Sequence, residues 1–96
     1  MDLNRYSKLA NELQEGDVVA KTTGDGEEYY YIDAEPFYDI DEKRWHCWIK
    51  KLTWDQVLAY FSDDSNEYVQ EYFPEIGIED WDIEHGRNNI TFLSDT

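Results

Sequence analysis

Residues 17–34 have the sequence DVVAKTTGDGEEYYYIDA, which predicts a β-hairpin. Residues 17–23 contain a Val-Val-Ala run and residues 27–34 are rich in Tyr and Ile, residue types that fit strands. The Gly-Asp-Gly segment at residues 24–26 tolerates the positive φ angles that a tight turn requires. An antiparallel sheet built on this hairpin is therefore the centre of the predicted fold.

An amphipathic helix is predicted before the hairpin. Apolar side chains from Leu3 to Leu13 recur at offsets 0, 3, 6, 7 and 10, a spacing typical of one helix face. Gly16 then supplies a common helix stop. The sequence predicts a helix over residues 3–13.

A second strand pair is predicted after the hairpin. Pro36 interrupts the chain, and residues 37–40 then pair with residues 44–50 across an acidic turn. Side chains in a strand alternate between the two faces. One face of the later strand carries Trp45, Cys47 and Ile49, and the other carries Arg44, His46, Trp48 and Lys50.

Two short helices are predicted in the middle of the chain. Thr53 and Gln56 have the spacing of a capping box, followed by helical periodicity over residues 54–61. Ser65 caps a second short helix, which ends before Pro74.

Two closing strands complete the predicted fold. Residues 79–85 alternate between apolar and acidic side chains, and residues 89–93 follow after a turn. We therefore predict a single α+β domain over residues 1–96. It consists of a twisted antiparallel sheet of about five strands, an N-terminal helix and two short central helices.

The composition is strongly acidic. The 96 residues include 23 Asp and Glu but 8 Lys and Arg, so the formal net charge is −15. Because 17% of the residues are aromatic and 41% are hydrophobic, a folded domain is expected rather than a disordered chain. The charge argues against direct binding to nucleic acid or to an anionic membrane, since both would repel it.

The sequence points to a cytoplasmic protein without a catalytic or metal site. Cys47 is the single cysteine, and the N-terminus lacks the basic and apolar regions of a signal peptide. His46 and His85 do not form a metal-binding His-x-x-x-His pair. No serine lies in a nucleophile motif, and the acidic strand lacks the glycine of a calcium loop. We therefore expect no enzyme activity and no cofactor.

The excess negative charge is concentrated in the second half of the chain. Residues 52–96 hold 11 acidic side chains and one basic side chain, Arg87, whereas residues 1–51 hold 12 and 7. On the predicted strand, Asp80, Asp82 and Glu84 point to one face. Their spacing of about 6.6–6.8 Å equals about two axial nucleotide steps of 3.4 Å. The predicted partner-binding residues are Asp80, Asp82 and Glu84 on this strand, Glu67, Glu71, Asp63 and Asp64 on a helical ridge, and Tyr29 or Tyr31 as an aromatic anchor.

The tyrosines have two interpretations. Tyrosine beside carboxylates makes a good contact surface, because its ring is rigid and its hydroxyl is polar. Alternatively, Tyr29 and Tyr31 pack the sheet. Trp48 is a further candidate for exposure, since it shares its face with Arg44 and Lys50.

These features favour a protein-binding inhibitor. In size, acidity and lack of an active site, the chain is similar in type to phage-encoded anti-restriction and anti-CRISPR proteins. The hypothesis is a mimic of the phosphate backbone that blocks a basic nucleic-acid-binding protein or nuclease complex. One alternative is an immunity or antitoxin protein that neutralises a basic nuclease toxin. Another is an acidic adaptor subunit with no inhibitory role.

Overall fold

The protein is mostly β-structure. The computed structural model describes residues 3–62, 77–84 and 88–95. The described strands, all antiparallel, are β1 (Asn4–Leu9), β2 (Val18–Thr23), β3 (Gly26–Ile32), β4 (Phe37–Asp39), β5 (Arg44–Leu52), β6 (Ile78–Ile83) and β7 (Asn89–Ser94). Within these described ranges they are accompanied by one α-helix, α1 (Trp54–Ser62), and a 3₁₀ turn, η1 (Ala10–Glu12).

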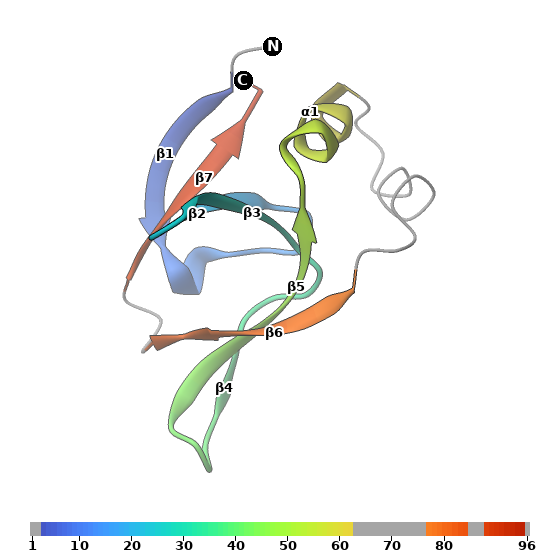
Figure 1. Ribbon diagram of the computed structural model, residues 1–96. Coiled ribbons are helices and arrows are strands. Elements are labelled where there is room, and N and C mark those ends of the chain that lie inside the picture. Colours follow the sequence, from blue (N-terminus) through green and yellow to red (C-terminus); the bar gives the residue numbers. More distant parts are fainter. Residues whose placement is uncertain (1–2, 63–76, 85–87, 96) are drawn as a thin grey trace.

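The strands form one sheet that curls into an open half-barrel (Figure 1). Its strand order is β1-β7-β2-β3-β5, and both edges of the long strand β5 are used. Ile49 shows this, because it pairs with Ile32 of β3 on one side and with Glu79 of β6 on the other. Strand β4 continues the β3 side through its pairing with the start of β5. Among the described elements, β6 pairs with β5 alone and so forms an edge of the sheet.

The predicted hairpin is confirmed and forms the centre of the sheet. Val18 pairs with Tyr31 at one end, and Thr23 pairs with Gly26 beside the turn. Gly26 has a φ of 127°, which explains why a glycine suits this position.

Both faces of the central strands are buried. One core cluster fills the inside of the curl and includes Val19, Tyr30, Ile32 and Phe92. A second cluster lies on the opposite face of the sheet and contains residues of α1. Its buried members are Val18, Ala20, Tyr31, Leu52, Val57 and Leu93. Strand alternation therefore sends neighbouring residues of one strand into two different cores.

The predicted α+β class and the N-terminal helix are wrong. All six residues of β1 pair with β7, from Asn4 with Ser94 to Leu9 with Asn89. An isolated amphipathic helix of this length gains little without a packing surface, whereas β7 offers a row of backbone groups to pair. Of the apolar residues that predicted the helix, Ala10 and Leu13 are fully buried, and the 3₁₀ turn brings this i, i+3 pair onto the core.

The first central helix is confirmed, including its capping box. The backbone N–H of Thr53 donates to Gln56 Oε1 at 2.8 Å, and the N–H of Gln56 donates to Thr53 Oγ1 at 3.2 Å. The predicted second central helix, residues 65–73, lies outside the described residues. The strands predicted near residues 79–85 and 89–93 correspond to β6 and β7.

Candidate protein-binding surface

The acidic strand β6 and its neighbours form one outer sheet face. Directly paired residues of antiparallel strands point to the same side, and His46 pairs with both Phe37 and Asp82, while Trp48 pairs with Asp80. We call this the acidic face and define it as Phe37, Asp39, Arg44, His46, Trp48, Ile78, Asp80 and Asp82. It continues the face that bears the α1 cluster, and no described element covers it.

Two of the predicted acidic residues are held by side chains of β5. Asp82 forms an ion pair with Arg44 at 2.8 Å, and Asp80 contacts His46 Nδ1 at 3.1 Å. The two aspartate side chains nevertheless remain 46% and 48% exposed. The pairing thus orients these carboxylates and neutralises part of their charge while leaving them accessible. Glu84, the third predicted residue, is also exposed.

His46 lies between two carboxylates. Glu42 Oε2 lies 2.8 Å from its Nε2, Asp80 contacts its Nδ1, and the ring of Phe37 stacks on it at 5.6 Å. Burial lowers the pKa of His46, but the attraction of Asp80 and the hydrogen bond to Glu42 outweigh burial. The pKa is therefore raised above its ordinary value, so proton binding is favoured here.

Large apolar side chains are exposed beside the acids. Trp48 is 45% exposed next to Asp80, Ile78 is 52% exposed on the same edge strand, and Phe37 is 42% exposed. Tryptophan is among the residues enriched in the hot spots of protein interfaces. The acidic face is thus a mixed surface of carboxylates and apolar anchors.

The predicted tyrosine anchors lie elsewhere. Tyr31 is 5% exposed, packs edge-on against Tyr60 of α1 and lies near Lys50, which pairs with Asp33 at 3.3 Å. Burial raises the pKa of Tyr31 to about 12. Tyr29 is partly buried and contacts the ring of Trp54 at 5.1 Å. The alternative interpretation, packing of the sheet, therefore describes Tyr31. Trp48, in contrast, is an exposed aromatic side chain on the acidic face.

The predicted helical ridge of Asp63, Asp64, Glu67 and Glu71 lies outside the described residues, so only the strand part of the predicted site is placed. Sequence reasoning missed Phe37 and Ile78 and the pairing of Arg44 and His46 with the acids. The sequence did contain a signal for this pairing. Arg44 and His46 are two residues apart in one strand, and Asp80 and Asp82 are two residues apart in another.

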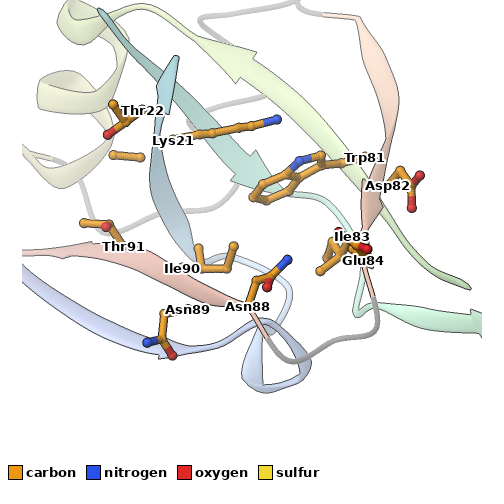
Figure 2. A pocket seen from close by; sticks show the side chains of 11 residues that line it. Lys21, Thr22, Trp81, Asp82, Ile83, Glu84, Asn88, Asn89, Ile90 and Thr91 are labelled. Atoms are coloured by element: carbon orange, nitrogen blue, oxygen red, sulfur yellow. The ribbon is translucent and has the colours of Figure 1, made fainter. Parts of the chain in front are cut away.

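A pocket of about 430 Å³ lies near the other side of β6 (Figure 2). Residues of β2, β6 and β7 line it, and Lys21 extends from β2 over the ring of Trp81 at 5.7 Å. Asp82 of β6, Glu84, which directly follows that strand, and Asn88 also line the pocket. Asp82 therefore belongs both to the acidic face and to the lining of the pocket.

Comparison of the chain with protein-family models, with curated proteins and with solved structures finds no match in any of the three. Within the described residues, no helix has both the length and the apolar character that crossing a membrane requires. The functional argument consequently rests on the geometry of the acidic face.

Proposed function

We propose that this protein is a cytoplasmic, non-enzymatic inhibitor of the phage-encoded anti-restriction or anti-CRISPR type. In this proposal its acidic face occupies the nucleic-acid groove of a basic partner protein. The observation that carries the proposal is the exposure of Asp80 and Asp82 at alternate positions of an edge strand, beside exposed Trp48.

The charge of the acidic face supports a basic partner. Three carboxylates of the face, those of Asp39, Asp80 and Asp82, gather with that of Glu42 from the adjoining turn around Arg44 and His46. Charge complementarity of this kind raises association rates and suppresses wrong partners more than it adds affinity. Binding is therefore expected to be fast and sensitive to salt.

The ion pairs on the face support a mimic with ordered charges. Because Arg44 and His46 hold the aspartates in place, less side-chain entropy is lost when a partner binds. Alternate strand residues are about 6.6–6.8 Å apart. The spacing of Asp80 and Asp82 along the strand is therefore close to two axial nucleotide steps of about 3.4 Å each. Trp48 and Ile78 then supply the apolar contacts that a charge pattern alone lacks.

The exposed apolar residues also favour the second candidate, an immunity protein for a basic nuclease toxin. Such a protein binds a single partner tightly, and a central aromatic anchor can supply much of that binding energy. The two functions differ in where the partner is held, because only a mimic competes with nucleic acid for the same groove.

A capture experiment with competing DNA tests the proposal. The purified protein is immobilised, incubated with bacterial lysate, and washed with or without excess duplex DNA at low salt. The proposal predicts that the retained protein binds nucleic acid and is released by the DNA. A retained nuclease that duplex DNA does not displace supports the immunity function instead, and retention of proteins without nucleic-acid affinity contradicts both.

A further inference from the structure

Three metal-ligating side chains meet at the hairpin that joins β4 to β5. Asp39 ends β4, Glu42 lies in the turn and His46 lies in β5. One ligand atom from each lies within 4.8 Å of the others. We infer that these three residues bind a Zn²⁺ ion, an inference that does not rest on the proposed inhibitor function.

The orientation of His46 is the strongest support for this site. The side chain is only 10% exposed, and its ring is held by Asp80 at Nδ1 and by the stacked ring of Phe37. Histidines that ligate metals commonly donate their second ring N–H to a carboxylate, which fixes the ring and its tautomer. Asp80, from strand β6, contacts Nδ1 of His46 in this way. The other ring nitrogen, Nε2, is therefore the one available to ligate the ion.

The turn holds the two carboxylates next to this nitrogen. Asp39 Oδ1 accepts the backbone N–H groups of Asp41 and Glu42 at 2.9 and 3.1 Å. Lys43 adopts a left-handed φ of 57°, which helps the chain to turn back into β5. Glu42 and His46 consequently face each other across the turn, with 2.8 Å between Oε2 and Nε2.

The donor set matches Zn²⁺. Zn²⁺ takes imidazole nitrogen and carboxylate oxygen, with bonds of about 2.0–2.2 Å and a tetrahedral arrangement that water often completes. Ligand atoms in such a site are about 3.3–3.6 Å apart. The three atoms reach this spacing if Asp39 moves inward slightly and the exposed Glu42 moves outward slightly. A nitrogen ligand also favours Zn²⁺ over Mg²⁺ and Ca²⁺, which prefer oxygen ligands.

The competing interpretation is that His46 is simply a protonated partner of Glu42 and Asp80. That arrangement satisfies the same atoms and needs no ion. The two interpretations differ in measurable zinc affinity and in its dependence on His46, because exposed carboxylates alone bind divalent cations diffusely.

Calorimetric titration of the full chain with ZnCl₂, in excess Mg²⁺ and with any affinity tag removed, tests the inference. We expect a single saturable site. His46→Gln and Glu42→Gln should each weaken zinc binding at least about tenfold, and Asp80→Asn should weaken it by about 10–100-fold, as loss of an outer-shell partner does. The matched control His85→Gln changes the chain's other histidine and should leave the affinity within about twofold.

Binding of Co²⁺ in place of Zn²⁺ gives a second, spectroscopic measurement. Visible absorption of tetrahedral Co²⁺ should appear with the wild type and with His85→Gln but not with His46→Gln. Circular dichroism confirms that each variant is folded. The inference is overturned if zinc fails to bind, if excess Mg²⁺ abolishes binding, or if folded His46→Gln binds zinc as the wild type does.

Discussion

Two isoleucines of β6 can test which face of this strand packs against the core. Ile83 is 3% exposed and belongs to the cluster inside the curl, whereas Ile78 is 52% exposed on the acidic face. Replacing Ile83 by Ala removes three carbon atoms, or about 2.4 kcal/mol at about 0.8 kcal/mol per buried methylene. The cavity left behind adds to this, so Ile83→Ala should lower the free energy of unfolding by about 2–5 kcal/mol.

Urea denaturation followed by tryptophan fluorescence measures this change. With a urea dependence of about 1–1.5 kcal/mol per molar for a domain of this size, the midpoint should fall by at least about 1 M. Ile78→Ala is the matched control and should change the free energy of unfolding by less than about 0.5 kcal/mol. Similar losses for the two variants, or a larger loss at Ile78, would refute the placement of β6 and of the acidic face.

Three further predictions concern the helix cap, the buried thiol and the histidine. Thr53→Ala removes the hydrogen bond to the N–H of Gln56 and should cost about 1 kcal/mol in urea denaturation; no measurable loss would contradict the capping role. Burial, with nearby carboxylates, raises the pKa of the Cys47 thiol to about 12, so a thiol reagent at pH 8 should react at least about 100-fold more slowly than in urea; equal rates would contradict its burial. The raised pKa of His46 means that its protonated form stabilises the fold. In the presence of a chelator, the stability advantage over His46→Gln should be complete below about pH 6.5 and be lost as the pH rises through the raised pKa; an advantage that grows with pH would contradict this sign.

The parts of the fold predicted from sequence are those in which local chemistry decides the structure. The hairpin of β2 and β3 follows from its Gly-containing turn and its β-favouring strands, and the start of α1 follows from the capping box of Thr53 and Gln56. Both signals lie within a few residues of the element that they specify. Neither depends on a distant partner.

Strand β1 shows why the rest was not predictable. Its structure is decided by pairing with β7, at the other end of the chain, and every residue of β1 is exposed, so it lacks the alternation that predicts a strand. The helical spacing from Leu3 to Leu13 came partly from the 3₁₀ turn that buries Ala10 and Leu13.

In the candidate site, too, local features could be predicted from the sequence and features that depend on distant partners could not. The shared face of Asp80 and Asp82 follows from alternation within one strand. Their pairing with His46 and Arg44 depends on the register of β6 against β5, and the burial of Tyr31 beside α1 depends on where that helix packs.

The central claim is that the acidic face binds a basic partner. The most direct measurement is the affinity of the partner captured from lysate for the wild type and for two variants, each with three carboxylates neutralised. One variant changes Asp80→Asn, Asp82→Asn and Glu84→Gln. The control changes three exposed acids elsewhere in the chain, Glu12→Gln, Asp25→Asn and Glu35→Gln.

Biolayer interferometry at low and high salt provides the affinities, with circular dichroism to confirm that both variants fold. The wild type and the control should bind with similar affinity, weakening as salt increases, because the interaction is electrostatic. The variant of Asp80, Asp82 and Glu84 should bind at least about tenfold more weakly, a loss of about 1.4 kcal/mol. Equal affinity of the two variants would contradict the claim.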